Sequence, residues 1–267
     1  MIISMKEVLI TGKNGYIGKN IGELLKSQED KYIVSYLSLR KENWEKNDFS
    51  KYDIVIHLAG MVHLKENKKN YNVYDEINYE LTKKISKLAL SGGVKHFVFM
   101  STIAVYGVES LINKSVIINE NTPTKPKTYY GKSKLKAENF LKTISNDEFK
   151  VTIVRPPMVY GDNCPGNYNS LEKIALRVPI FPKIENNKSV VNINKLSVGI
   201  LRIIENPREE TIVIQDDTYM NTSQTVKNIA LSKNKKLYLS KTLGILVCFF
   251  GYRSKILNKI FGNMVYK

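Results

Sequence analysis

The sequence is poor in cysteine and histidine, and it contains no acidic residue after Asp217. Its two cysteines, Cys164 and Cys248, are far apart and lack CxxC spacing, which argues against a disulfide framework or a metal site. The longest apolar run, Leu243 to Tyr252, has ten residues, about half of the roughly 20 that a membrane-spanning helix needs. The first residues show no secretory signal pattern, so we expect a cytoplasmic protein.

The charge is strongly positive and unevenly distributed. There are 41 Lys and Arg residues against 25 Asp and Glu, a net charge of +16, and nine of the basic residues follow Asp217. No nucleic-acid-binding signature accompanies them, so we expect no nucleic-acid partner. The simplest interpretation is a solvated lysine-rich surface, and the alternatives are an anionic ligand or an anionic membrane surface.

Strand-like and helix-like segments alternate through about the first 160 residues. This alternation predicts βαβ units, a parallel sheet and therefore an α/β fold of the Rossmann-type, doubly wound kind. Beyond Pro156 the segments become shorter, which predicts a main domain over residues 1–160 and a small lobe over 161–267 whose strands return to the main sheet. The expected strands are 7–11, 33–37, 53–58, 96–100, 151–154, 190–193 and 211–214, and the expected helices are 17–25, 74–90 and 130–145.

A glycine-rich run, TGKNGYIG at residues 11–18, follows the first strand and opens the first helix. Its first glycine permits a tight turn, its second lets backbone N–H groups approach a pyrophosphate, and its third lets the helix lie close to the strand. In this context the run predicts a dinucleotide site. The residues assigned to it here are Gly12, Gly15, Tyr16, Ile17 and Gly18.

Tyr130 and Lys134 are four residues apart on an expected helix and therefore share a face. A neighbouring ammonium lowers the pKa of a tyrosine, which suits proton transfer at an alcohol or ketone carbon. Taken alone, this spacing is also common on exposed helices. The overlapping Gly131-Lys132-Ser133 looks like the end of a P-loop, but Pro126 stands where that loop requires a glycine.

These motifs occur together in the order found in one protein family. The sequence resembles the extended short-chain dehydrogenases/reductases of the NAD-dependent epimerase/dehydratase family over about its first 160 residues. A finer resemblance, to capsular and O-antigen UDP-sugar C4 reductases and epimerases of the staphylococcal capsule type, extends to the last residue through CPGNYNSL at 164–171 and FGNMVY at 261–266. The runs that carry the family resemblance are TGKNGYIG at 11–18, IHLAG at 56–60, STIAVYG at 101–107, YGKSK at 130–134 and RPPMVYG at 155–161.

The resemblance implies roles for individual residues. Tyr130 would be the catalytic acid and base, Lys134 would hold the nicotinamide ribose and depress the tyrosine pKa, and Thr102 would hydrogen-bond the reacting oxygen. In the second lobe, Asn169 and Lys188 would bind the substrate, with Lys188 in the place of an arginine that contacts the nucleotide diphosphate. The residues it places at the cofactor are Gly12, Gly15, Tyr16, Ile17, Gly18, Arg40, Asp48, Leu58, Ala59, Gly60, Tyr130, Lys134 and Pro157.

Several polar residues have less certain roles in this comparison. We expect His57 to be a strand-end residue beside the cofactor rather than a catalyst, while His63 and His96 have no expected partner. Asn78 matches a family helix position near the active site, with a structural role equally open. The Asp48-Phe49 pair resembles one that contacts adenine.

The choice between NAD and NADP depends on the end of the second strand. A NAD-specific fold usually places an acidic residue about 20 residues after the glycines, but LSLR at 37–40 contains none. Arg40 could face a 2′-phosphate there, which favours NADP over NAD, or it could be merely solvated.

The resemblance implies an NAD(P)-dependent enzyme that acts at C4 of a UDP-amino sugar in capsular or surface polysaccharide synthesis. We expect it to reduce a UDP-4-keto-6-deoxy sugar, and the alternatives are a UDP-sugar 4-epimerase and a non-catalytic NAD(P)-binding protein. The resemblance also implies a homodimer through helices 74–90 and 130–145.

The C-terminal region carries two further expectations. Relatives continue beyond the FGNMVY run with a closing helix, so we expect the substrate lobe to be truncated. Residues 237–265 are expected to complete the sugar-nucleotide lobe, with weak contact to an anionic membrane surface as a secondary alternative.

Overall fold

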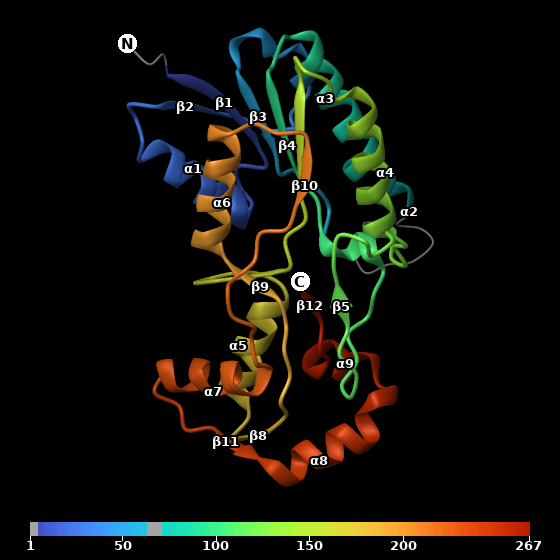
Figure 1. Ribbon diagram of the computed structural model, residues 1–267. Helices are drawn as coiled ribbons and strands as arrows, with labels where there is room; N and C mark the ends of the chain where they lie inside the picture. The colour runs from blue at the N-terminus through green and yellow to red at the C-terminus, as the bar shows by residue number, and fades with distance from the viewer. Residues whose placement is uncertain (1–4, 63–70) are drawn as a thin grey trace. The chain divides into compact units, whose positions relative to one another are not determined.

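The computed structural model of the chain describes residues 5–62 and 71–267 (Figure 1). The chain forms two compact units. The larger comprises residues 1–107, 124–157 and 193–214, and the smaller comprises residues 108–123, 158–192 and 215–267. Neither unit is a continuous stretch of sequence, because the chain passes repeatedly from one to the other.

The larger unit contains a parallel sheet of six strands in the order β10-β6-β4-β3-β1-β2. This confirms the α/β, Rossmann-like fold expected from the alternating segments. The chain starts in the middle of the sheet and reverses direction between β1 and β3, and in such sheets ligands bind beyond the carboxyl ends of the strands at that point. The strands are β1 Lys6–Thr11, β2 Tyr32–Leu37, β3 Ile54–His57, β4 His96–Met100, β6 Lys150–Val154 and β10 Glu210–Ile212.

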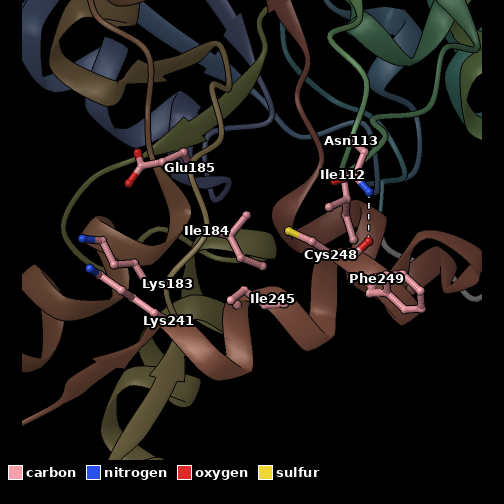
Figure 2. A pocket seen from close by; sticks show the side chains of 10 residues that line it. Ile112, Asn113, Lys183, Ile184, Glu185, Lys241, Ile245, Cys248 and Phe249 are labelled. Carbon is pink, nitrogen blue, oxygen red and sulfur yellow. Dashed lines mark hydrogen bonds between the residues drawn. The ribbon is translucent and has the colours of Figure 1, made fainter.

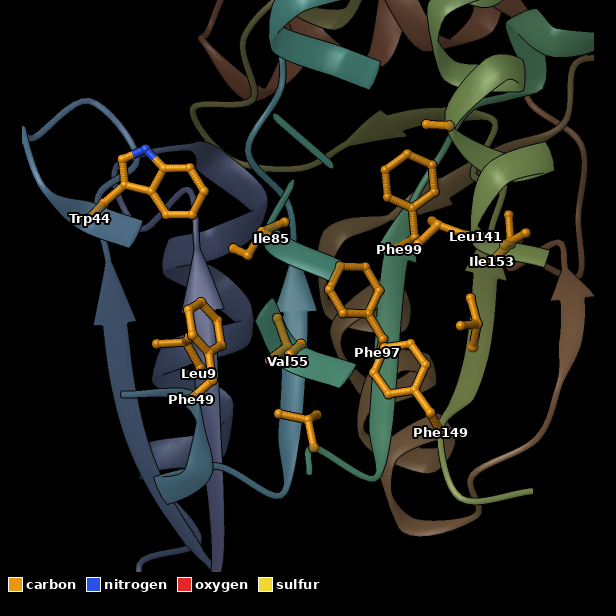
Figure 3. Close-up of a cluster of buried hydrophobic side chains, with 14 residues drawn as sticks. Leu9, Trp44, Phe49, Val55, Ile85, Phe97, Phe99, Leu141, Phe149 and Ile153 are labelled. Carbon is orange, nitrogen blue, oxygen red and sulfur yellow. The ribbon is translucent and has the colours of Figure 1, made fainter. Parts of the chain in front are cut away.

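Helices cover both faces of this sheet, which explains why its central strands β3 and β4 are buried throughout. All five residues of β4 are buried, as expected for a strand with covered faces. On one face, side chains of α3 and α4 pack with Phe97, Phe99 and Phe149 into one cluster (Figure 3). Figure 1 shows α1 and α6 on the other side of the sheet. The helices of this unit are α1 Tyr16–Lys26, α2 Tyr71–Asp75, α3 Leu81–Ser91, α4 Tyr129–Ile144 and α6 Ile193–Glu205.

The helix expected over residues 74–90 is interrupted. A π-helical segment, Glu76–Glu80 (η4), lies between α2 and α3. A π-helical turn inserts one residue and rotates the following side chains, and such turns are frequent at functional sites. Here Asn78, within the turn, is completely buried. The regular helical spacing inferred from the sequence was therefore wrong at this point.

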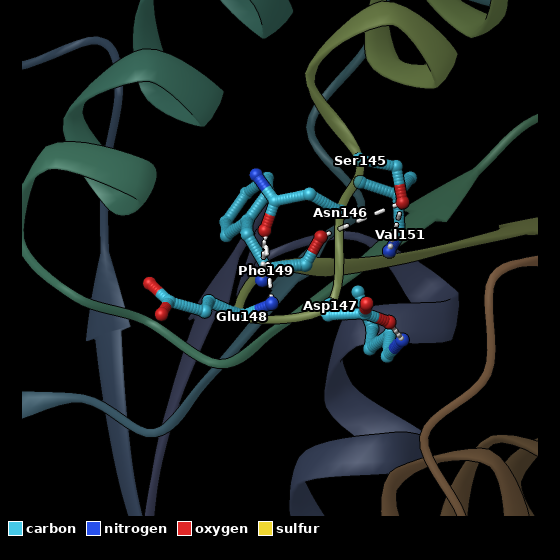
Figure 4. Close-up of polar contacts among 7 residues, drawn as sticks. Ser145, Asn146, Asp147, Glu148, Phe149 and Val151 are labelled. Atoms are coloured by element: carbon cyan, nitrogen blue, oxygen red, sulfur yellow. Dashed lines mark hydrogen bonds and ion pairs between the residues drawn. The ribbon is translucent and has the colours of Figure 1, made fainter.

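The connection between α4 and β6 is a tight polar turn (Figure 4). The Asn146 side chain accepts hydrogen bonds from the backbone N–H groups of Glu148 and Phe149, both at 2.9 Å. The Ser145 hydroxyl accepts one from the Val151 N–H at 3.2 Å. These contacts fix the start of β6 and direct the Phe149 ring into the core, where it is 1% exposed.

The smaller unit consists of short strand pairs and helices around its own apolar cluster, to which Phe181 and Phe261 contribute with ring centroids 5.3 Å apart. The strands that the sequence places at 190–193 and 211–214 are present as β9 Val190–Asn192 in this unit and as β10 in the larger sheet. Its helices are α5 Asn167–Arg177, α7 Thr222–Ser232, α8 Lys241–Phe250 and α9 Lys255–Phe261. Its other strands are β5 Ile117–Ile118, β7 Met158–Tyr160, β8 Ile180–Pro182, β11 Tyr238–Ser240 and β12 Val265–Tyr266.

His96, for which no partner was expected, lies buried at the start of β4. Its Nε2 atom is 2.8 Å from the Thr152 hydroxyl, and that hydroxyl donates to the Arg208 carbonyl at 2.6 Å. Because the only hydrogen of the hydroxyl is used there, the histidine must be the donor to Thr152. Burial lowers the pKa of His96 to about 4, and the charge of Lys6 adds to this effect, so the folded protein holds a neutral imidazole.

This neutral histidine predicts loss of stability in mild acid. In the unfolded chain His96 takes up a proton near pH 6.5, whereas in the folded chain it stays neutral down to about pH 4. The free energy of unfolding therefore falls as the pH decreases between these values. For one such histidine the fall from pH 7 to pH 5 is about 2 kcal/mol. His96→Gln keeps a donor for Thr152 and removes the titration, so it should reduce the pH dependence by that amount. Denaturant unfolding at both pH values measures this, and equal pH dependence in both proteins would contradict it.

Candidate active site

The glycine-rich turn lies at the carboxyl end of β1. Gly12 has φ +81°, a conformation that L side chains rarely adopt, and a Cβ atom there would come within 3.0 Å of the Ala59 nitrogen. A Cβ atom on Gly18 would come within 2.5 Å of the Gly12 carbonyl oxygen. The first glycine is thus needed for the turn and the third for close packing of α1, as the sequence predicts.

The same turn fits the phosphates of a dinucleotide. Gly15 is the N-cap of α1, which begins at Tyr16 and continues through Ile17. Because glycine has no side chain, the first N–H groups of the helix can be reached by a pyrophosphate, which the positive end of the helix dipole also favours. The residues present therefore fit a dinucleotide, and these N–H groups are the ones that would hold it.

A chain of buried hydrogen bonds runs behind the turn. Thr11 lies 2.8 Å from Nδ1 of His57, and Nε2 of His57 lies 3.0 Å from the Thr82 hydroxyl, which donates to the Asn78 carbonyl at 2.9 Å. His57 must therefore donate to Thr82 and accept from Thr11. Burial lowers the pKa of His57 to about 3, helped by the charge of Lys134. A neutral histidine with both nitrogens engaged holds the strand ends in place.

The loop after β3 is fixed by Asn78. Its side-chain amide accepts from the Met61 N–H at 2.7 Å and donates to the Met61 carbonyl at 3.0 Å and to the Ser133 hydroxyl at 3.0 Å. The Ser133 hydroxyl in turn donates to the Tyr130 carbonyl at 2.9 Å. Asn78 therefore joins the loop that contains Leu58, Ala59 and Gly60 to the first turn of α4.

The structure brings together the three expected catalytic residues in the larger unit. Thr102 follows β4, and its hydroxyl forms a hydrogen bond with Tyr130 near the start of α4. Lys134 is 3% exposed, and its ammonium donates to the Met100 carbonyl at 2.8 Å and lies 4.5 Å from the centroid of the Phe99 ring. A Cβ atom on Gly60 would come within 3.3 Å of the Lys134 nitrogen. Gly60 therefore leaves close-fitting space beside this ammonium.

The pKa of Tyr130 differs from the sequence-based expectation. Burial raises it to about 12, and the hydrogen bond with Thr102 only partly opposes this. Burial also lowers the pKa of Lys134 to about 8, against the opposing charge of Glu138. The expected lowering of the tyrosine pKa was thus wrong for the protein alone, because loss of hydration dominates.

A buried ion pair that the sequence analysis missed lies one turn farther along α4. Glu138, fully buried, accepts from Nε of Arg155 at 3.0 Å and from Nη2 at 2.5 Å. It also accepts a hydrogen bond from Ser101, the residue before Thr102, and Arg155 donates to the Tyr106 hydroxyl at 3.0 Å. The available signal was the position of Glu138, four residues after Lys134 on the same helix.

The remaining candidate residues are placed as follows. Arg40 is exposed in the turn after β2. Asp48 is exposed and caps a 3₁₀ turn by accepting from the Ser50 N–H at 3.1 Å, and its hydrogen bonds with Ser50 lower its pKa. Pro157 is buried at the end of the segment after β6. His63 lies outside the described residues.

Asn169 and Lys188 belong to the smaller unit. Asn169 is half-buried in the first turn of α5. The Lys188 ammonium donates to the Lys259 carbonyl, and its pKa is lowered to about 8 by burial and by the charge of Lys259. Lys188 is therefore held within its own unit, and its role toward a substrate stays a prediction.

Comparison with known proteins identifies the family. The model of the NAD dependent epimerase/dehydratase family matches residues 8–179. The chain belongs to this family. It is therefore an enzyme that uses a nicotinamide nucleotide. Among the described residues, no helix is long and apolar enough to cross a bilayer.

Curated relatives of this epimerase/dehydratase family member match over nearly all of its length. It is 30% identical to N-acetyl-alpha-D-glucosaminyl-diphospho-ditrans,octacis-undecaprenol 4-epimerase of Escherichia coli O157:H7, over 96% of this chain and 81% of that protein. It is 27% identical to UDP-glucose 4-epimerase of Vibrio cholerae, over 97% of this chain and 83% of the relative. The fold is similar to that of Bacillus anthracis dTDP-4-dehydrorhamnose reductase in complex with NADP, with a TM-score of 0.71, 21% identity, and 88% and 83% of the two chains covered.

The Glu138 ion pair predicts that neutralising two carboxylates near α4 has very different effects on the free energy of unfolding. Glu138→Gln leaves the Arg155 guanidinium buried without its counter-charge, so it should destabilise this family member by about 3–5 kcal/mol. Asp75→Asn breaks the more exposed pair with Lys136, where the charged atoms are 2.8 Å apart, and should cost less than about 1 kcal/mol. Denaturant unfolding compares the variants. Equal losses of unfolding free energy in the two variants would contradict a stabilising role of the Glu138–Arg155 ion pair.

Proposed function

We propose that the protein is an NAD(P)-dependent 4-epimerase of a UDP-amino sugar. The observation that carries the proposal is the contact of the Tyr130 and Thr102 hydroxyls, with the buried Lys134 four residues after Tyr130 on α4, in the unit that contains the glycine-rich turn. Two paired hydroxyls suit proton exchange with an alcohol or ketone oxygen. The printed names of the two curated relatives, both 4-epimerases, support C4 of a hexose as the reacting carbon.

The chain's own residues would move the proton. In epimerisation the phenolate form of Tyr130 would accept the proton of the C4 hydroxyl and later return it, while Thr102 hydrogen-bonds the same oxygen. The Lys134 ammonium stabilises negative charge as it develops on these oxygens. When bound, the nicotinamide nucleotide accepts and returns the hydride. Asn169 and Lys188 are proposed to bind the sugar nucleotide, the latter through the charge of its ammonium on the diphosphate.

The direct test is to offer the purified protein NAD⁺ or NADPH with UDP-N-acetylglucosamine, UDP-N-acetylgalactosamine, UDP-glucose and a UDP-4-keto-6-deoxy amino sugar. A polyprenol-linked N-acetylglucosaminyl diphosphate, the kind of substrate in the name of the E. coli relative, completes the panel. An epimerase interconverts the C4 hydroxyl isomers with no net change in nicotinamide absorbance. Failure with every substrate in a folded, nucleotide-binding protein would contradict the proposal.

Tyr130→Phe removes the proposed acid and base and leaves the ring in place. We expect turnover to fall by a factor of roughly 10²–10⁴, the usual contribution of a positioned acid/base, with nucleotide binding retained. Tyr129→Phe, the neighbouring tyrosine on α4, is the matched control and should keep activity. Turnover like that of the wild type in a folded Tyr130→Phe protein would contradict the assignment of Tyr130 as the acid and base.

Reduction of a UDP-4-keto-6-deoxy amino sugar is the second candidate, and two observations favour it. The raised pKa of Tyr130 makes the phenol a proton donor at neutral pH, which is the role a reductase needs first. The exposed Arg40 after β2, with no acidic residue in 37–40, favours NADPH, a cofactor that a reductase consumes. Stoichiometric loss of NADPH absorbance with the 4-keto sugar would identify this reaction.

Arg40→Asp tests the cofactor assignment. A carboxylate repels a 2′-phosphate but accepts hydrogen bonds from ribose hydroxyls, so preference should move from NADPH toward NADH by about tenfold or more. Dissociation constants for both nucleotides, measured by fluorescence titration, decide it. Arg40→Gln separates loss of the positive charge from gain of the negative one. If the ratio of the two constants does not change, Arg40 belongs to the solvated surface.

We also propose a homodimer through α3 and α4. On α4, Leu135, Phe140 and Ile144 are only half-buried within the single chain. The Tyr79 and Phe140 rings meet edge to face with centroids 6.5 Å apart, which forms a preorganised aromatic surface for a second copy.

A further inference from the structure

Helix α8 is apolar on the side that faces solvent. Residues 242–252 contain no charged side chain. Along this helix Ile245 is 68% exposed, Phe249 70% and Phe250 68%. A helix on the surface of a soluble protein normally turns charged side chains outward. Large apolar side chains on the outer side indicate a surface that binds another apolar surface, such as a protein or a membrane.

The side of α8 that faces the protein carries the small residues Gly244 and Cys248, and contacts at both residues hold it in place. Gly244 is buried against the backbone of Lys183, where a Cβ atom would lie within 2.1 Å of the carbonyl oxygen. The Asn113 side chain donates to the Cys248 carbonyl at 2.9 Å (Figure 2). A groove of about 760 Å³ runs beside the helix, and Ile245 and Phe249 contribute to its lining. The helix is therefore held by Gly244, Val247 and Cys248, while Ile245 and Phe249 remain largely exposed.

The apolar surface continues beyond α8. Leu246 and Tyr252 are about half exposed, and Ile256 at the start of α9 is 71% exposed. We call this set the α8 surface; its members are Ile245, Leu246, Phe249, Phe250, Tyr252 and Ile256.

Positive charge surrounds this surface. Lys241 precedes the apolar run, Arg253 follows it, and Lys255 and Lys259 lie on α9, all of them exposed. The nearby acidic side chain of Glu185, in the groove, accepts a hydrogen bond from Asn221 at 3.1 Å. Because no acidic residue follows Asp217, the helices that carry the α8 surface are purely basic. Apolar and aromatic side chains flanked by Lys and Arg match the interface of an anionic bilayer.

We propose that the α8 surface docks on an anionic lipid bilayer, with α8 lying in the plane of the headgroups. Ten residues of helix are about 15 Å long, far too short to span the hydrocarbon layer. Pairing with a second copy about a twofold axis would instead bring the basic residues of both copies together, which is unfavourable. The proposal is independent of the reaction assigned above.

Vesicle flotation tests the docking. The full chain should float with phosphatidylcholine vesicles that contain phosphatidylglycerol, and bind pure phosphatidylcholine vesicles at least about tenfold more weakly. Ile245→Ser/Phe249→Ser should reduce binding to the anionic vesicles by at least about tenfold. Leu176→Ser/Leu231→Ser, which changes exposed leucines on α5 and α7, is the matched control and should bind like the wild type.

A fluorescence measurement on single substitutions keeps the test valid if the double variants fold poorly. Trp44 is the only tryptophan and is 8% exposed in the core of the larger unit. Phe249→Trp should therefore report on α8, with a blue shift on anionic vesicles and quenching by brominated lipid. Leu231→Trp, the control on α7, should show neither.

Three results would overturn the proposal. The first is no binding of the wild-type chain to anionic vesicles. The second is equal binding by the Ile245→Ser/Phe249→Ser variant and its control. The third is an oligomer in lipid-free solution, seen by light scattering, that only the α8 variant abolishes. The last result would assign the surface to a second copy of the chain.

Discussion

The buried carboxylate of Glu138 is the constraint on which the active edge of the larger sheet depends. A charge without hydration must be fully compensated, and here the compensation comes from Arg155 after β6 and Ser101 after β4, while α4 carries the carboxylate. The ends of two neighbouring strands and the catalytic helix are thereby fixed to one another. Thr102 follows Ser101 directly, so the hydroxyl to which we assign a role in the reaction is positioned by a buried carboxylate.

The same carboxylate determines the charge near the reacting oxygens. Burial favours a neutral Lys134, and Glu138 opposes that effect, so the pKa of about 8 leaves the lysine mainly charged at neutral pH. Lys134 in turn helps to keep His57 neutral. A neutral His57 can accept from Thr11 and donate to Thr82, which connects the end of β1 to Asn78 and the loop after β3. The dinucleotide turn and the catalytic helix are thus parts of one electrostatic arrangement.

The sequence identified the features that short motifs determine. Gly12 and Gly18 are required by local geometry, and alternating segments defined the parallel sheet before any contact was known. The sign of the Tyr130 pKa shift was wrong, because the shift arises from burial by residues remote in sequence, which spacing on one helix does not reveal. Likewise Glu138 and Arg155 are 17 residues apart, and no local pattern marks them as partners. The helices of the smaller unit are short and depend on tertiary packing, so periodicity alone did not identify them.

Epimerisation and reduction at C4 would use the same three side chains, so the catalytic residues do not distinguish these reactions. The difference must arise where the nucleotide is retained or released and where the sugar is held. In the larger unit one candidate place is the end of β2, where residues 37–40 include Arg40 and no acidic residue that could bind ribose hydroxyls. A protein that binds its nucleotide weakly there exchanges it after each hydride transfer and behaves as a reductase. One that binds it tightly would keep the reduced nucleotide long enough to return the hydride, so we propose that nucleotide affinity, on the same proposed catalytic residues, decides the reaction type.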